Sequence, residues 1–485
     1  MRRVATISAA KMALCVINII PPAWAQDRPD VVDRSTEDTN HHVSQQTTWP
    51  QFRGHLGRSV SRASNIPLEW SSDNVMWRAS TPSFGQSSPV IWNDTVFLTS
   101  IEGASKETLW ISALRLTDGK EQWRRAFLAS EQHEFNDYVS KAAPTPAVDE
   151  ERVYALFASG DLYAVTHAGD VAWHRDLSTE YGSFGGNHGV GSSVILTPQA
   201  VVVFLARRDY SYLLSIERTT GDTLWKTDRK AGVAWTTPTL SPDGHEIIVS
   251  ASGQVQGFNS DTGQLLWTFE GLTGNNVPSP SVTENLVITG GLGVEANLAL
   301  RRGEKGQLAN PSIAWRADSA SNFGSPLVYT NCAYWVNPAG VARCLDIDTG
   351  VRRWIHRLPS SVWATPLGYK DYVYFFGTNG VTEVLRATAD GPHVVATNHI
   401  SVSAPVTGYA VVDGAIVVRA GREIIRIGPG NYRNHASINK RVPPHMVWDL
   451  NEGTRFKHRH AWGVPATLQE YINESHATTN PKGTY

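Results

Sequence analysis

The chain has 485 residues, of which 41% are hydrophobic and 18% are charged. This composition excludes disordered and collagen-like proteins and is sufficient to bury a large core. With 43 basic and 45 acidic residues, the formal net charge is −2. That balance argues against a nucleic-acid partner, for which a basic face is expected.

The N-terminus is typical of a secretory signal. Arg2, Arg3 and Lys11 precede the apolar run "MALCVINII", and "AWA" supplies small residues for cleavage. The sequence therefore predicts a signal peptide over residues 1–25 and a flexible polar lead-in over residues 26–48. A membrane anchor is the alternative, but nine apolar residues are too few for a hydrocarbon core of about 30 Å. We expect a periplasmic or secreted protein without a transmembrane segment in the mature chain.

A small residue followed by proline opens an extended run again and again along the chain. Successive openings are separated by 39 to 57 residues, a period typical of four-stranded propeller blades. Because proline cannot donate to a β-ladder, its place at the start of a run suits the innermost strand. The eight openings are Ser88-Pro89, Thr145-Pro146, Ser192-Ser193, Thr237-Pro238, Ser279-Pro280, Ser325-Pro326, Thr365-Pro366 and Ala404-Pro405.

A second repeat places glycine four residues before tryptophan at the end of five units. Turn residues such as "TDG" and "DTG" follow an apolar run of strand length, which indicates a hairpin into a fourth strand. The fifth unit has Pro311 instead of glycine and a lengthened loop, "RRGEKGQLANPS", and the seventh has Val395 where tryptophan belongs. The tryptophans interpreted as braces between units are Trp77, Trp123, Trp173, Trp225, Trp267, Trp315 and Trp354.

The eighth unit lacks a final strand of its own. Residues near Val75 to Ala79, with Trp77, lie ahead of the first unit and can complete the eighth, closing the ring and removing open edges. We therefore predict an all-β protein, an eight-bladed β-propeller over residues 49–430. A right-handed parallel solenoid is the alternative, although its repeats are usually shorter.

The motifs "TDGKEQW", "TTGDTLW", "DTGQLLW" and "DTGVRRW" resemble the tryptophan-docking motif of the pyrroloquinoline-quinone (PQQ) repeat propellers. That group contains PQQ-dependent alcohol dehydrogenases and the outer-membrane assembly lipoprotein BamB. The resemblance covers roughly residues 49–430, including the opening stretch "WPQFRGHLGRSVS". It implies tryptophans that pack between neighbouring blades, but it does not decide function, because many members do not bind the cofactor.

Evidence for an enzyme is weak in the sequence. The resemblance implies that a quinoprotein would carry adjacent cysteines over the quinone and several oxygen ligands for calcium. There is no adjacent cysteine pair, so no cofactor is predicted and PQQ with calcium is the alternative. The acids nearest the inner strands, Asp149 to Glu151 and Asp243, fall in turns and are expected to be solvated. No catalytic residue and no metal ligand is predicted.

Loops that precede the inner strands should gather around one mouth of the central channel. Their polar and aromatic residues could form a concavity for a small ligand. The alternative is that the tryptophans pack the channel wall and the glycines make turns. The candidate residues are His188, Trp235, Asn275, Asn276 and Trp363.

Two further features are left open. Cys332 and Cys344 flank the turn-like "NPAG" and could form a disulfide in an exported protein, or they could be two buried thiols. The polar C-terminal tail, residues 431–485, carries five of the 16 histidines and suits a solvated or partner-binding segment better than a metal site. The sequence thus favours a protein-binding or assembly scaffold in the cell envelope. A PQQ-dependent oxidoreductase, or another enzyme at the channel mouth, is the alternative.

Overall fold

The computed structural model describes residues 46–132, 142–184, 189–272, 277–321 and 323–429. All of them belong to one compact unit, Val43–Tyr485. The predicted signal peptide, nearly all of the lead-in and the tail lie outside the described residues. Within the described residues, no helix is both long enough and apolar enough to span a membrane.

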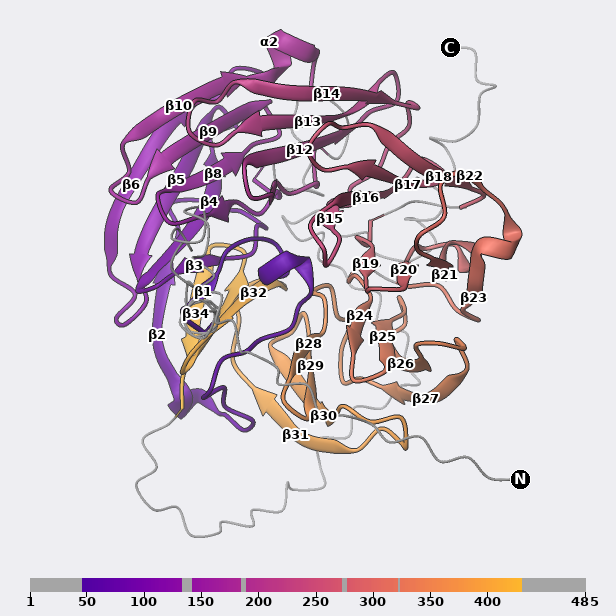
Figure 1. The fold of residues 1–485 in the computed structure, drawn as a ribbon. Coiled ribbons are helices and arrows are strands. Elements are labelled where there is room, and N and C mark those ends of the chain that lie inside the picture. The colour runs from indigo at the N-terminus through magenta and orange to yellow at the C-terminus, as the bar shows by residue number, and fades with distance from the viewer. Residues whose placement is uncertain (1–45, 133–141, 185–188, 273–276, 322, 430–485) are drawn as a thin grey trace, which may run out of the picture. The chain divides into compact units, whose positions relative to one another are not determined.

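Eight antiparallel blades follow one another around a ring, and each has four strands in its repeat (Figure 1). The predicted eight-bladed β-propeller is therefore confirmed. Blades 1 to 4 comprise β3 (Val90–Trp92), β4 (Thr95–Glu102), β5 (Thr108–Arg115) and β6 (Glu121–Leu128); β7 (Ala147–Val148), β8 (Arg152–Leu156), β9 (Asp161–Thr166) and β10 (Val171–Asp176); β11 (Ile195–Leu196), β12 (Ala200–Ala206), β13 (Ser211–Glu217) and β14 (Thr223–Arg229); β15 (Thr239–Leu240), β16 (Glu246–Ala251), β17 (Gln254–Asn259) and β18 (Leu265–Glu270). Blades 5 to 8 comprise β19 (Ser281–Val282), β20 (Leu286–Thr289), β21 (Leu298–Arg301) and β23 (Ile313–Arg316); β24 (Leu327–Tyr329), β25 (Cys332–Val336), β26 (Val341–Asp346) and β27 (Arg352–Arg357); β28 (Leu367–Tyr369), β29 (Tyr372–Phe376), β30 (Val381–Arg386) and β31 (Val394–His399); β32 (Val406–Val412), β33 (Ala415–Ala420), β34 (Glu423–Ile427) and β2 (Val75–Ser80).

The ring closes as the sequence predicts. Strand β2 pairs antiparallel with β34, so a strand from the N-terminal side completes the eighth blade. Two blades also receive a fifth strand: β1 (Thr48–Trp49) pairs with β3, and β22 (Gly306–Leu308) pairs with β18 in parallel. Five short helical elements interrupt the described chain: η1 (His55–Gly57), η2 (Ser72–Asn74), α2 (Leu177–Tyr181), η3 (Val294–Ala296) and η4 (Asn310–Ser312).

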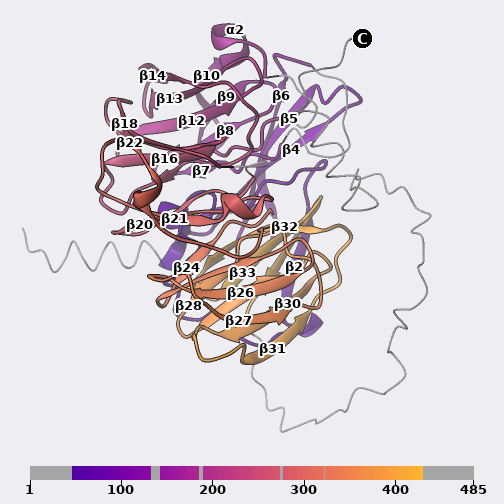
Figure 2. The same cartoon turned by 90° about the vertical axis from the view of Figure 1, so that its right-hand side faces the viewer.

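Burial explains why the strands differ in composition. Every residue of β12 and β16 is buried, because the central strands of a blade are covered on both faces by the neighbouring blades. The outer strand β6 instead alternates exposed and half-buried side chains. Figure 2 shows the blades from the side, with their sheets lying face to face around the ring.

Each outer strand carries a register shift directly before the tryptophan position. In β10, for example, Val171 and Trp173 pair with Val165 and Ala164, so one residue bulges between them. Such bulges increase the local twist and re-aim the next side chain. In blade 7 the bulge falls at Val395, and the buried Ala396 takes the tryptophan position. The assignment of Val395 to that position was wrong, because the position lies five rather than four residues after the turn glycine, Gly391.

Six of the seven predicted tryptophans contact the next blade through the indole N–H. The N–H donates to a backbone carbonyl of that blade at 2.7 to 3.3 Å, from Trp77, Trp123, Trp173, Trp225, Trp315 and Trp354. For five of them, a turn glycine of the next blade with φ between +68° and +87° lies against the ring, leaving no room for a Cβ. The seventh, Trp267, packs instead on Gly257 of its own blade and pairs with Gly306 of β22.

The two cysteines are free and buried between blades 6 and 7. The register pairs Cys344 with Tyr334 and Cys332 with Asp346, so the two cysteines do not lie directly opposite one another. A hydrogen bond from the Cys344 thiol lowers the pKa of the Cys332 thiol. The structure thus contains a neighbouring thiol pair rather than a disulfide.

Candidate functional site

A ring of hydroxyl groups surrounds the axis at the small residues that open the inner strands. The backbone N–H of one blade donates to the Ser or Thr side chain of the next, at 2.9 to 3.2 Å. Alanine at position 404 has no hydroxyl, so the series ends before blade 8. The six bonds run from Ser88 to Thr145, Thr145 to Ser193, Ser193 to Thr237, Thr237 to Ser279, Ser279 to Ser325 and Ser325 to Thr365.

Residues 48–61, here called the plug segment, lie across the ring axis and contact all eight blades. Figure 1 shows this indigo stretch at the centre of the ring. Its contacts are Thr48 and Trp49 with β3, Pro50 with Val148, Gln51 with Leu196, Leu56 with Leu240, Arg53 with Ser281 and Pro326, Ser59 with Gly368, and Trp49 with Tyr409.

Arg53 anchors the plug segment. Its guanidinium donates to the Pro280 carbonyl at 2.9 Å, the Ser281 hydroxyl at 2.5 Å and the Pro326 carbonyl at 3.3 Å. Burial lowers the pKa of Arg53 to about 10, so the group remains charged at neutral pH. A buried cation held by carbonyls ties the plug segment to blades 5 and 6, and part of the axial space is therefore filled by the chain itself.

The residues predicted at the channel mouth are only partly described. His188, Asn275 and Asn276 lie outside the described residues. Trp235 and Trp363 are both half-buried, and each packs locally. The Trp235 ring lies against Gly191, and the Trp363 ring meets Phe323 edge-on at 5.6 Å. These two tryptophans precede the inner strands of blades 4 and 7 and are not neighbours in the ring.

The expectation of solvated turn acids was wrong for Asp149, whereas Asp243 is exposed as expected. Asp149 is buried; it accepts from the Tyr154 hydroxyl at 2.8 Å and pairs with Arg218 at 3.1 Å. Asp243, which is 46% exposed, pairs with Arg302 at 3.2 Å. Spacing in the sequence could not predict these partners, because each cation comes from the following blade.

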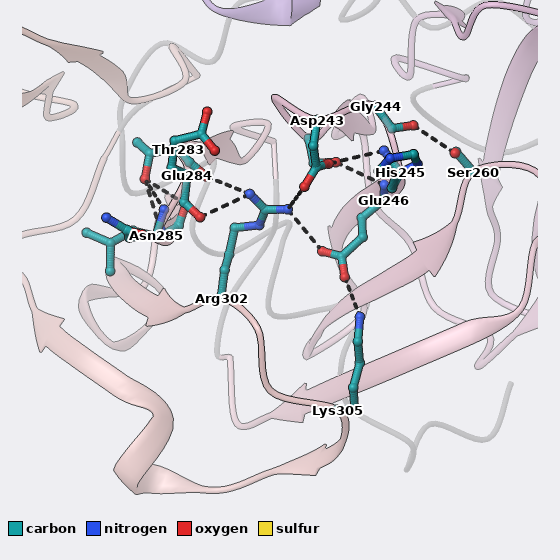
Figure 3. A network of polar contacts seen from close by, with 12 residues as sticks. Asp243, Gly244, His245, Glu246, Ser260, Thr283, Glu284, Asn285, Arg302 and Lys305 are labelled. Atoms are coloured by element: carbon teal, nitrogen blue, oxygen red, sulfur yellow. Dashed lines mark hydrogen bonds and ion pairs between the residues drawn. The ribbon is translucent and has the colours of Figure 1, made fainter. Parts of the chain in front are cut away.

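Asp243 belongs to a polar cleft of about 440 Å³ between blades 4 and 5 (Figure 3). Arg302 lies at its centre and is only 8% exposed. Its guanidinium reaches Asp243 and, at 3.5 Å, Glu246, and it also donates to the carbonyls of Thr283 and Glu284. The cleft is lined by Asp243, His245, Glu246, Asn259, Leu266, Glu284, Arg302, Gly303 and Lys305.

The charges in this cleft differ in how accessible they are. Glu246 is 10% exposed and accepts from the ammonium of Lys305 at 2.7 Å, while Lys305 itself is 57% exposed. A hydrogen bond from the Ser241 hydroxyl, with further help from the His245 N–H and Arg302, lowers the pKa of Asp243 to about 2. The cleft therefore presents charged side chains of both signs, and Lys305 is the more exposed member of its pair with Glu246.

The donor set for calcium-bound PQQ is not found among the described residues. They contain no group of three or more His, Cys, Asp or Glu side chains that could hold a metal ion. The two cysteines lie within blade 6 and are separated in the chain, so they cannot form a vicinal clamp.

Sequence reasoning missed the cleft but noticed the irregularity that produces it. The fifth unit lacks the regular turn before its tryptophan, and "RRGEKGQLANPS" was interpreted only as a longer loop. In the structure this stretch crosses to blade 4, where it supplies Arg302, Lys305 and β22. The irregular fifth unit was the one feature of the sequence that could have indicated this cleft.

The comparisons with known proteins agree with this architecture. No curated protein sequence matches the chain. Among solved structures, BamB from Moraxella catarrhalis is 13% identical with a TM-score of 0.54, covering 74% of this chain and 99% of that chain. Quinohemoprotein alcohol dehydrogenase from Comamonas testosteroni is 10% identical with a TM-score of 0.59, covering 84% of each chain. At these identities the likeness concerns the fold alone.

A family model shows to which protein family the chain belongs. The model described as outer membrane protein assembly factor BamB matches residues 63–187 and 183–395, which together exceed half of the chain. The matched residues begin just after the plug segment and continue into the last strand of blade 7. This protein therefore belongs to the family of the outer membrane protein assembly factor BamB.

Proposed function

We propose that this protein is an exported scaffold that binds other proteins in the cell envelope. The observation that carries the proposal is the charged cleft between blades 4 and 5, which is open at the surface of the closed ring. Membership of the family of an outer membrane protein assembly factor points in the same direction. The predicted signal over residues 1–25 supports export.

The physical argument concerns what the cleft offers to a partner. Exposed charges of both signs guide encounter and discriminate between partners more than they add affinity. Asp243 and Lys305 are about half exposed. Their partners, Arg302 and Glu246, are nearly buried and hold the two exposed side chains in position. The plug segment braces the inner strands of every blade, so the cleft is presented on a stiff platform.

Affinity purification after in vivo crosslinking tests the proposal. The full chain is exported to the cell envelope, crosslinked there and purified, and it should recover a specific partner. Glu284→Lys should reduce that recovery, because it reverses a charge at the cleft. Glu121→Lys reverses an exposed charge on blade 1 and serves as the matched control. The proposal fails if the wild type repeatedly recovers no specific partner while the purified protein turns over alcohols or sugars, as the oxidoreductase alternative requires.

A further inference from the structure

The loop between β21 and η4 crosses from blade 5 to the outer edge of blade 4. We call residues 303–309, which follow the anchored Arg302, the strap. Its strand β22 pairs in parallel with β18, with Gly306 opposite Trp267 and Leu308 opposite Phe269. Figure 1 shows β22 beside β18 at the rim of the ring. The outer edge of blade 4 therefore already accepts an additional strand.

Two side chains of the strap hold it on this edge. Leu308 is buried in the cluster that contains Trp267 and Phe269. Three residues earlier, Lys305 pairs with Glu246 at 2.7 Å. An extended segment on this edge is thus held in two places, by an apolar socket at β18 and by the carboxylate of Glu246 on β16, which is 10% exposed.

The strap is held lightly in comparison with a regular strand. Its pairing spans three residues, and Gly303 and Gly306 adopt φ of +98° and +78°, which only glycine adopts without strain. Lys305 is more than half exposed, and the cleft beside it provides room for a second chain. Addition of an extended peptide to a sheet edge is a general mode of recognition, in which pockets for side chains supply specificity.

We propose that the outer edge of blade 4 binds an extended partner segment that carries a basic residue followed three positions later by an aliphatic one. The strap occupies the site as an internal surrogate and is displaced by the partner. This inference rests on the proposed scaffold function and names the chemistry of its partner. Charge complementarity argues for that occupant, because the surrogate's lysine meets Glu246 and its leucine fills the socket.

The test uses the full chain and a fluorescent peptide of residues 302–310, RGEKGQLAN, which contains the strap sequence. In the wild type the tethered strap competes at an effective concentration of about millimolar, so the free peptide should bind weakly. Lys305→Glu places a carboxylate against Glu246 and should open the strap, raising the apparent affinity about tenfold or more, because affinity scales with the open fraction. Lys120→Glu alters an exposed, carboxylate-paired lysine on blade 1 and should bind as the wild type does.

Hydrogen exchange provides an independent readout. The amides of Trp267–Phe269 should exchange faster in Lys305→Glu and regain protection when the peptide is added. If Lys305→Glu leaves exchange unchanged, Leu308→Ser empties the socket and serves as the second variant. Peptide binding to neither variant, or equal binding of a peptide with glutamate and serine in place of its lysine and leucine, overturns the inference.

Failure of the edge-binding proposal can be distinguished from failure of the scaffold function. If crosslinking recovers an envelope partner and RGEKGQLAN does not compete with it in the opened variant, the scaffold stands and the edge site is wrong. If the peptide binds the opened variant but no partner is ever recovered, the edge binds strands and the scaffold function is wrong.

Discussion

Replacement of Trp123 by alanine tests whether the outer-strand tryptophans hold neighbouring blades together. The indole N–H donates to the His167 carbonyl of blade 2 at 2.7 Å, and the ring lies against Gly169, which has no side chain to fill the space left behind. Truncation of a buried tryptophan costs about 3–5 kcal/mol. Because Trp123 is half-buried, we expect about 3 kcal/mol, which includes about 1 kcal/mol for the hydrogen bond.

Equilibrium urea unfolding followed by far-ultraviolet circular dichroism measures this loss. Trp123→Phe keeps a ring but no donor and should lose less. Trp110→Ala is the control, since its indole donates to Glu102 of the same blade at 3.0 Å and should cost below about 1 kcal/mol. Partner binding by the folded fraction should be intact in all three variants. Equal losses in Trp123→Ala and Trp110→Ala, or loss of binding without loss of stability, would refute the reasoning.

Three further predictions concern the hydroxyl ring, the cleft and the cofactor. Thr237→Ala removes the acceptor for the Ser193 N–H and should cost about 1–2 kcal/mol, while Thr237→Ser should restore most of it; an unchanged urea midpoint in the alanine variant would show that the ring contributes nothing. The folded pKa of Asp243, about 2, lies below its ordinary value of 3.8, so its stabilisation is present above about pH 4 and is lost as the pH falls toward 2. Asp243→Asn should therefore differ from the wild type in stability at pH 6 and converge with it near pH 2; a constant difference would contradict this. Saturating PQQ with calcium should leave the melting temperature unchanged, and a rise would support the quinoprotein alternative.

The sequence alone determined the ring. The spacing of the small-residue openings and of Gly-x-x-x-Trp predicted eight blades and the closing strand β2, because each unit repeats one local pattern of turn and strand residues. It predicted a brace at Trp123 for the same reason. Where local spacing was shifted by one residue, as at Val395 and Ala396, the prediction failed.

Only the tertiary structure decided which distant groups meet. The plug segment reaches all eight blades, Arg53 anchors to Pro280 and Pro326, and Arg302 joins the acids of the preceding blade. These contacts link residues that are tens to hundreds of positions apart, and no local periodicity encodes them. The candidate site lies where the repeat is broken, because a strap that leaves its own blade must find partners elsewhere, and those partners are set by the closure of the ring.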